Sequence, residues 1–205
     1  MANEADVFVV DDDDAVRDSI VLSLRLAGHK VEAFRSATAF LDAGAAQRRG
    51  CLVTDIRMPE MDGLELQEEL ARRGAKLAVV VITGHGDVPL AVRAMKAGAT
   101  DFLEKPFARE ALLGCVARAL DAAPKAASDA ETQALRARLN TLTPREREVF
   151  ARVVAGKQSK VVAYELGTSP RTVEVHRARM MKKMAAANLA DLVRMALALG
   201  GEFLR

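Results

Sequence analysis

The first 120 residues alternate between two patterns of hydrophobic and polar positions. Short, mostly apolar runs rich in β-branched residues occur at Val7–Val10, Cys51–Thr54 and Ala78–Ile82. Such runs are typical of strands that are buried on both faces of a parallel sheet. Between them, segments such as Ala15–Ala27 and Leu64–Arg72 carry apolar residues at helical spacing. Five strand–helix units in series predict an α/β doubly wound (βα)5 fold with a parallel sheet.

Turn and cap residues mark the other elements of this half. Two further short strands are expected at Lys30–Phe34 and Asp101–Glu104. A helix capped by Ser36 follows the first of these, and a helix capped by Asp87 precedes the second. A last helix runs from about Arg109 to Leu120.

Residues 141–205 show only helical spacing. The segment Thr143–Glu146 is a helix start, because threonine caps, proline takes the first position and glutamate closes a capping box. A short helix at Ser159–Glu165 is followed by a Gly-containing turn and a longer basic helix, Ser169 to about Met184. A fourth helix follows Asn188. This order predicts an all-α helix-turn-helix domain.

The charge distribution separates the two patterns. Residues 1–120 carry 15 Lys and Arg against 19 Asp and Glu, whereas residues 141–205 carry 12 against 6. Residues 121–140 are balanced, and their Ala, Ser, Pro and Lys content up to about 130 is typical of a linker. We therefore expect a domain at 1–120, a partly helical linker at 121–140 and a domain at 141–205 whose partner is a polyanion.

The composition excludes several classes of protein. No apolar run reaches the roughly 18 residues that a membrane span needs, and the first residues lack the order of a signal peptide. We expect a cytoplasmic protein, with Cys51 and Cys115 as buried, inert thiols. The sequence has no zinc-ligand spacing, no Gly-rich phosphate loop and no Ser-His-Asp arrangement.

Residues suited to phosphoryl chemistry stand at the ends of four predicted strands. Asp11 and Asp12 follow the first strand, Asp55 the third, Thr83 the fourth and Lys105 the fifth. Ligands of such sheets bind beyond the carboxyl ends of the strands, so these side chains should converge. The carboxylates suit Mg²⁺, and Asp55 is the candidate nucleophile. Thr83 and Lys105 are expected to contact phosphoryl oxygens.

Each of these residues has an ordinary alternative when it is taken alone. The acidic run Asp11–Asp14 is typical of a solvated turn, and Lys105 of a surface lysine. Asp13 and Asp14 are better explained as caps of the following helix than as metal ligands. The shared position at one edge of the sheet is what favours a site.

Residues 5–120 resemble the CheY-type receiver domains. The matching motifs are Asp11-Asp12, the segment Asp55–Gly63, Thr83 and Lys105-Pro106. The resemblance implies that a histidine kinase phosphorylates Asp55 with Mg²⁺ bound, and that the bond before Pro106 is cis.

The same resemblance implies particular roles for individual residues. Metal contacts are expected from Asp12, Asp55 and the backbone carbonyl of Arg57, with Asp11 acting through water. Phe102 matches the switch aromatic of the family. From the residues themselves it is a core residue on the last strand, and both roles can hold together.

Residues 141–205 resemble the LuxR-type helix-turn-helix domains, mainly through the segment Pro170–Met184. Helical geometry places Val173, His176, Met180 and Met184 on one stripe that faces the core. A second stripe carries cations beside small and apolar residues, which suits a major groove.

Candidate DNA contacts fall into two groups. The resemblance implies that bases are read by Glu174, Val175 and Ala178, with Arg171 and Arg179 on the same stripe. Contacts to phosphates are expected from Lys157, Lys160, Thr172, Arg177 and Lys182.

The order of the two domains, with the stretches Thr83–Val92 and Phe102–Phe107, is similar to the FixJ group of NarL/FixJ-type response regulators. This similarity implies a phosphorylated homodimer on promoter DNA, with RNA polymerase as a further partner and activation of transcription as the expected effect. The group pairs through its fourth helix and fifth strand, so Ala91, Val92 and Met95 are expected on an outward face.

Two other functions remain open from the residues. One is a DNA-binding regulator that does not depend on phosphorylation. The other is a haloacid-dehalogenase-like phosphatase, which also uses an aspartate nucleophile and Mg²⁺. That enzyme needs a second catalytic carboxylate close after the nucleophile, and Arg57 stands two residues after Asp55. We therefore expect no enzyme.

Overall fold

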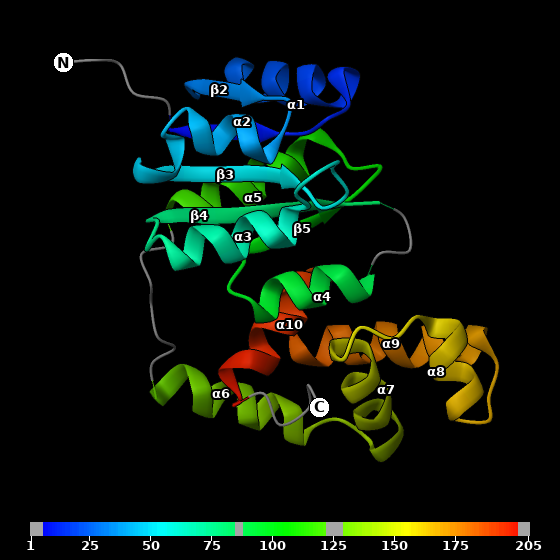
Figure 1. Ribbon diagram of the computed structural model, residues 1–205. Helices are drawn as coiled ribbons and strands as arrows, with labels where there is room; N and C mark the ends of the chain where they lie inside the picture. Colours follow the sequence, from blue (N-terminus) through cyan, green and yellow to red (C-terminus); the bar gives the residue numbers. More distant parts are fainter. Residues whose placement is uncertain (1–5, 85–87, 122–128, 201–205) are drawn as a thin grey trace. The chain divides into compact units, whose positions relative to one another are not determined.

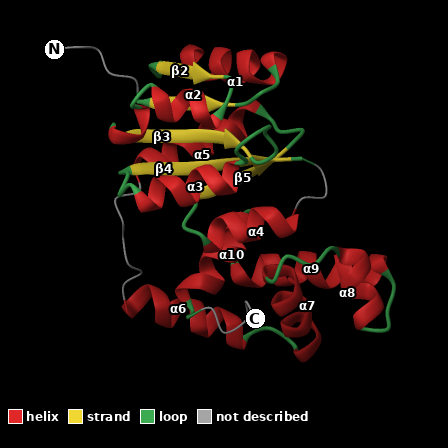
Figure 2. Ribbon diagram, viewed as in Figure 1, coloured by secondary structure: helices red, strands yellow, loops and turns green. Residues whose placement is uncertain are grey.

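The computed structural model describes residues 6–84, 88–121 and 129–200 (Figure 1). Contacts divide the chain into two compact units, Met1–His85 with Ala97–Ala123, and Gly86–Lys96 with Pro124–Arg205. The strands all lie in the first unit, and the described part of the second is helical (Figure 2).

The first unit is built on a five-stranded parallel sheet with the order β2-β1-β3-β4-β5. The strands are β1 (Val7–Val10), β2 (Val31–Phe34), β3 (Gly50–Asp55), β4 (Leu77–Thr83) and β5 (Asp101–Glu104). The order reverses beside β1, as in doubly wound folds, and the predicted fold class is confirmed.

Register brings the strand ends to one edge. Val10 pairs with Thr54, and Thr83 pairs with Glu104, so the residues that follow these strands leave the sheet together. Asp55 pairs with Ile82 on β4. The sheet thus delivers side chains from distant parts of the chain to a common edge.

Helices cover both faces of this sheet (Figure 1). Helices α1 (Asp14–Leu26) and α5 (Arg109–Asp121) pack on one face, where Leu24 and Val116 join the alternate strand residues in a buried cluster. Helices α2 (Ala37–Asp42) and α3 (Gly63–Arg72) cover the other face. A 3-10 turn, η1 (Ala45–Gln47), precedes β3. This two-sided burial explains why the strands are apolar throughout.

Local sequence signals fix the loops at the carboxyl edge. The Asp13 carboxylate accepts from the N–H groups of Ala15 and Val16, so Asp13 caps α1 as predicted. Asp62 and Glu65 form a capping box at the start of α3. Gly63 approaches β3 so closely that a Cβ atom there would lie 2.3 Å from the carbonyl oxygen of Asp55.

The second unit has a helical core. Its elements are α4 (Val88–Lys96), α6 (Asp129–Asn140), α7 (Pro144–Val154), α8 (Ser159–Glu165), α9 (Pro170–Met184) and α10 (Leu189–Ala198). Leu139 of α6 joins the cluster formed by the later helices. The Thr143–Glu146 capping box is present as predicted.

The burial of helix α4 differs from the prediction. Ala91, Val92 and Met95 were expected on an outward face, but each is at most 3% exposed. The expectation is wrong for this structure, because α4 contacts α10 within the second unit. The cap predicted at Asp87 lies outside the described residues.

Two smaller predictions concern apolar residues. Cys51 and Cys115 are free and buried, and burial raises the pKa of the Cys51 thiol to about 12, as expected for an inert thiol. In the part of the chain that the structure describes, no helix is long and apolar enough to cross a membrane.

Candidate functional site

The Lys105 ammonium group joins two strand ends. Its Nζ atom donates to Asp55 Oδ1 at 2.6 Å and to Asp11 Oδ2 at 3.1 Å. Asp11 is 1% exposed and Asp55 is 7% exposed, so both carboxylates lie almost inside the protein. The peptide bond from Lys105 to Pro106 is cis, as the resemblance implied. One cation thus balances two carboxylates that are distant in sequence.

Backbone donors fix the other carboxylate oxygens. The N–H of Asp13 donates to Asp11 Oδ1 at 2.9 Å, and the N–H of Arg57 donates to Asp55 Oδ2 at 2.8 Å. The Arg17 guanidinium donates to the backbone carbonyl of Asp11 at 2.9 Å. These bonds set the orientation of both side chains before any ligand arrives. Arg17 lies at an ordinary helical position, so no sequence signal distinguished it.

The ionisation of the cluster follows from its burial. Burial raises the pKa of Asp11, although the Asp13 N–H and Lys105 oppose it, and the nearby Asp55 adds to the rise. Burial works in the opposite direction on Lys105, but bonds to Asp55 and Asp11 prevail and raise its pKa. Lys105 therefore stays charged and offers its positive charge to both carboxylates.

The remaining predicted receiver residues lie around this cluster. Thr83 is buried at the end of β4, where its backbone carbonyl accepts from the Lys105 N–H at 2.8 Å. Asp12 is exposed, and Phe102 is 8% exposed on β5. Thr83 and Asp12 therefore stand at the same edge as the ion cluster, and Phe102 is packed in the sheet.

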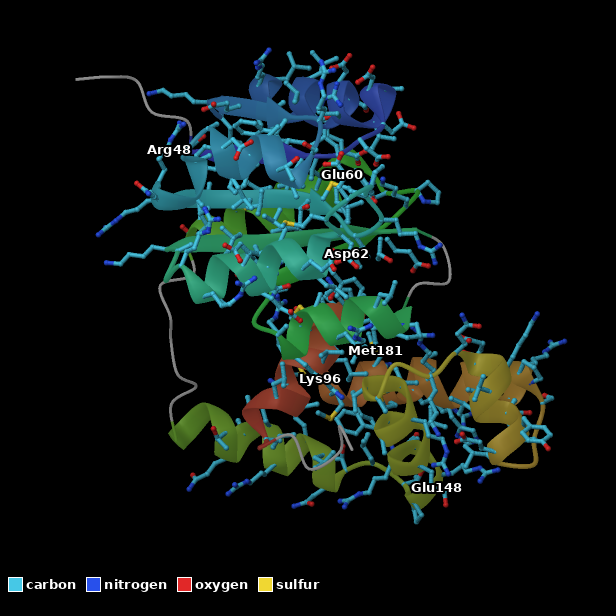
Figure 3. All side chains as sticks on the ribbon, viewed as in Figure 1. Arg48, Glu60, Asp62, Lys96, Glu148 and Met181 are labelled. Carbon is cyan, nitrogen blue, oxygen red and sulfur yellow. The ribbon has the colours of Figure 1, made fainter. Side chains whose placement is uncertain are left out.

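The loop after β3 carries further acidic residues (Figure 3). Glu60 adopts a φ of +67° and accepts from the Thr38 hydroxyl at 3.4 Å. Asp62 is occupied in capping α3. Neither residue belongs to the Lys105 cluster, and both lie outside the predicted metal set.

The carboxylates that Lys105 joins are candidate metal ligands. Among the described residues, no group of three or more His, Cys, Asp and Glu side chains is arranged to hold an ion. Asp11 and Asp55 nevertheless converge on one cation, the ammonium of Lys105, through hard carboxylate oxygens of the kind Mg²⁺ prefers. Asp12 directly follows Asp11, and Arg57 stands two residues after Asp55. The chemistry of these oxygen donors suits Mg²⁺, and their roles as ligands stay a prediction.

Helix α9 separates into the two predicted stripes. Val173, Met180 and Met184 are completely buried and pack in the helical core, and His176 is half-buried. The Ser169 hydroxyl caps the helix by accepting from the Thr172 N–H at 3.1 Å. The opposite stripe faces away from this core.

The predicted DNA contacts are largely on the surface. Those that are exposed are Lys157, Lys160, Arg171, Glu174, Val175, Ala178, Arg179 and Lys182, while Thr172 and Arg177 are half-buried. Two of the exposed residues already have partners in the protein. The Ser159 hydroxyl donates to Glu174, and Lys157 pairs with Glu165 at 2.5 Å. DNA contacts by these two residues would have to replace the existing bonds.

An ion pair between a buried glutamate and an exposed lysine, which sequence reasoning missed, holds α9 against the start of α7. Lys183 Nζ donates to Glu146 Oε2 at 2.6 Å, and Glu146 is 3% exposed. Burial alone would raise the pKa of Glu146, but Lys183 and the Thr143 N–H prevail and lower it. Helical spacing predicted that both residues lie in helices, but their pairing depends on how the two helices pack together.

Comparison with known families divides the chain in the same way as the sequence patterns. Residues 7–117 match the family described as "Response regulator receiver domain". Residues 140–196 match "Bacterial regulatory proteins, luxR family".

Whole-chain relatives combine both parts. The "Transcriptional regulatory protein FixJ" of Azorhizobium caulinodans is 51% identical over 98% of this chain and 95% of its own. The protein of the same name from Rhizobium meliloti is 50% identical over 95% of this chain and 96% of its own. A crystal structure of full-length FixJ from B. japonicum covers 97% of this chain and 98% of its own, with 45% identity and a TM-score of 0.55.

Proposed function

The chain belongs to the two-component transcriptional response regulators, with a receiver domain followed by a LuxR-type DNA-binding domain, and we propose that phosphorylation of Asp55 controls its binding to promoter DNA. This family implies a histidine kinase and DNA as partners, and its members are transcriptional regulators rather than classical enzymes. We place the receiver at 1–120, the linker at 121–140 and the DNA-binding domain at 141–205.

The observation that carries the proposal is the pairing of Asp55 with both Lys105 and the Arg57 N–H. A carboxylate oxygen of Asp55 attacks the phosphorus of a phosphohistidine on the kinase. The new oxygen–phosphorus bond forms as the phosphorus–nitrogen bond breaks, and the electron pair of that bond returns to the imidazole. Lys105 then contacts a phosphoryl oxygen in place of the carboxylate.

Receiver domains generally bind Mg²⁺ at the phosphorylation site. In this chain Asp12, Asp55 and the carbonyl of Arg57 would hold the ion, with Asp11 acting through water. The ion supplies positive charge that neutralises the phosphoryl oxygens. Asp11 contributes by keeping a fixed negative charge at the edge of the sheet, oriented by the Asp13 N–H.

The added charge then biases a two-state element. Lys105 and the Thr83 hydroxyl move toward the phosphoryl oxygens, and Phe102 changes its packing on β5. Thr83 is suited to this role because its hydroxyl donates only a long bond, 3.3 Å, to the carbonyl of Gly84 in the structure described. A short bond to a charged oxygen is a better alternative for that hydroxyl.

Phosphorylation is proposed to produce a homodimer through the receiver. Because Ala91, Val92 and Met95 are buried here, a dimer surface that uses them requires α4 to leave its present contacts. The dimer presents two α9 helices to two half-sites. Glu174, Val175 and Ala178 read bases and the exposed cations contact phosphates, and RNA polymerase is then recruited for activation.

The test combines light scattering with DNA binding on the full chain. Acetyl phosphate and Mg²⁺ should convert the parent from monomer to dimer and raise its affinity for promoter fragments. Asp55→Asn should show neither change, and Glu60→Gln, an acidic residue of the same loop, should behave as the parent. Equal DNA affinity of parent and Asp55→Asn under all conditions would establish a regulator that does not depend on phosphorylation.

A further inference from the structure

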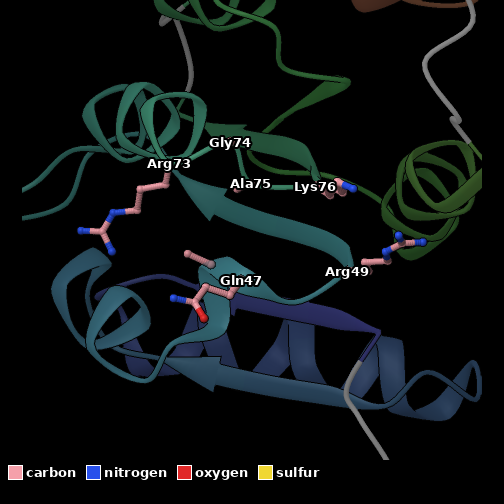
Figure 4. Close-up of a pocket in the computed structure, with 7 residues that line it drawn as sticks. Gln47, Arg49, Arg73, Gly74, Ala75 and Lys76 are labelled. Atoms are coloured by element: carbon pink, nitrogen blue, oxygen red, sulfur yellow. The ribbon is translucent and has the colours of Figure 1, made fainter.

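A second charged feature lies at the amino-terminal ends of β3 and β4. A hollow of about 570 Å³ opens there, within the range of small-molecule sites (Figure 4). Three cations, Arg49, Arg73 and Lys76, line it together with the Gln47 side chain. The other lining residues are small. No carboxylate stands among them.

The sheet register places two of these cations side by side. Gly50 pairs with Leu77 across the parallel strands, so the preceding residues, Arg49 and Lys76, are neighbours at the sheet edge. Figure 4 shows both side chains on one side of the hollow, with Arg73 and Gln47 on the other.

Two glycines make the turns that carry these cations. Gly50 has a φ of +142°, and a Cβ atom there would lie 2.4 Å from the carbonyl oxygen of Asp6. Gly74 has a φ of +64°, which favours glycine, and it separates Arg73 from the strand that starts just after Lys76. The backbone around the hollow is therefore fixed before any ligand binds.

The local charge contrasts with that of the domain. Residues 45–50 and 71–77 contain five of the 15 Lys and Arg in residues 1–120, and no Asp or Glu. Two of the five turn elsewhere. Arg48 pairs with Glu32 at 2.7 Å, with its guanidinium 4.7 Å from the centre of the Phe8 ring, and Arg72 pairs with Glu69.

Few acidic groups neutralise the cations that line the hollow. Arg73 shares Glu69 with Arg72. Within residues 6–84, 88–121 and 129–200, Arg49 and Lys76 form no ion pair. Neighbouring like charges repel, and an anion that bridges them removes this repulsion.

We propose that this hollow binds an oligophosphate group, either as a free inorganic anion or as the triphosphate of a nucleotide. Guanidinium groups match phosphate oxygens in pairs, Lys76 adds a point charge, and the Gln47 amide adds a neutral donor. A concave site with cations on two sides favours a compact, multiply charged ligand over an extended surface.

This site is separate from the phosphorylation site. Gly50 and Asp55 stand at opposite ends of β3, about 17 Å apart at the rise of a parallel strand. An oligophosphate in the hollow therefore does not compete with a phosphoryl group on Asp55. The inference does not rest on the proposed function.

The experiment is calorimetric titration of the full chain with sodium tripolyphosphate at about 0.15 M salt, without Mg²⁺ so that the acidic site does not take part. The parent should bind one ligand per chain. The double variant Arg49→Gln, Lys76→Gln should bind about tenfold more weakly or worse. Arg72→Gln removes an adjacent cation that does not line the hollow and should change the affinity less than about twofold. Thermal unfolding confirms that each variant is folded.

A parallel titration with ATP, again without Mg²⁺, distinguishes the two sources. If ATP binds more tightly than tripolyphosphate, the ligand is a nucleotide. If ATP binds equally or more weakly, the ligand is the inorganic anion. Either result supports the site, provided that the double variant loses the binding. Absence of binding by the parent to both ligands, or equal weakening by Arg72→Gln and the double variant, overturns the proposal.

Discussion

The carboxyl edge of the receiver sheet holds its charged groups inside the protein, whereas helix α9 displays its charged groups on an exposed face. At the sheet edge, Asp11 and Asp55 are nearly inaccessible and share Lys105. On α9, Arg171 and Arg179 are exposed. Substitutions at the first region should affect both stability and chemistry, while substitutions at the second should affect binding alone.

Lys105→Ala is the strongest test of the first half of this comparison. It leaves two buried carboxylates without their cation, which should lower the free energy of unfolding of the receiver by about 2 kcal/mol. Phosphorylation of Asp55 by acetyl phosphate should slow by about tenfold or more. Mass spectrometry and thermal unfolding measure the two effects.

Mg²⁺ sharpens this test. If Asp11 and Asp55 form a cation site, millimolar Mg²⁺ should stabilise Lys105→Ala more than the parent, because the ion restores the missing positive charge. Lys76→Ala serves as the control, since Lys76 is exposed and lies at the other end of β4. Equal responses to Mg²⁺ in all three proteins would contradict the predicted metal site.

The Glu146–Lys183 pair tests whether a buried charge in the helical unit behaves in the same way. Lys183→Met leaves Glu146 buried without its cation and should cost about 2 kcal/mol in the free energy of unfolding of this unit. The substitution also removes the hydrogen bond from Lys183 to the backbone carbonyl of Thr141, but that bond is exposed.

The pH dependence of the two units should differ in sign. The pKa of Glu146 is lowered, so its contribution is complete above the unfolded value near 4.5 and is lost as pH falls through the folded pKa. The pKa of Asp11 is raised, so its ionised form costs stability at neutral pH, and this cost disappears on acidification. Asp11→Asn should therefore stabilise the receiver at pH 7 but not at pH 3. A gain of the same size at both values would contradict the assignment.

Glu174→Gln probes the exposed face of α9. It should change the preference among bases at one position of each half-site by about 1–3 kcal/mol. Stability should stay within about 0.5 kcal/mol of the parent. Binding to a set of half-site variants measures the preference. Glu148→Gln on α7, another exposed glutamate, is the matched control and should leave the preference unchanged.

Lys182→Gln should give the smallest effect. Removal of one phosphate contact weakens binding to all sequences alike and reduces the slope of log K against log salt by about 1. Arg136→Gln on α6, outside the predicted face, should leave that slope unchanged. A change of base preference in Lys182→Gln would place this residue among the base-reading residues instead.

The sequence was sufficient for much of the fold because each signal was local. The apolar runs that end at Val10, Thr54 and Ile82 became adjacent parallel strands, and a parallel sheet brings such ends to one edge. The cap residues Asp13 and Thr143 were also predicted, since a cap depends only on residues three positions away.

Pairings between distant side chains were not predictable. Lys105 was expected near a phosphoryl oxygen, but its bonds to both Asp11 and Asp55 depend on how three strand ends are staggered. The Lys183–Glu146 pair and the bond from Ser159 to Glu174 likewise require the packing of separate helices. The sequence placed Ala91 in a helix, but it did not indicate that another helix would cover this residue.

The double use of Glu146 has a consequence for dynamics. Its Oε2 atom accepts from both the Thr143 N–H at 2.8 Å and the Lys183 ammonium at 2.6 Å. Opening of the first turn of α7 therefore also releases the end of α9. Amide hydrogens in that turn should exchange with solvent in step with those near Lys183, so the exchange rate at the start of one helix reports how firmly the DNA-reading helix is held.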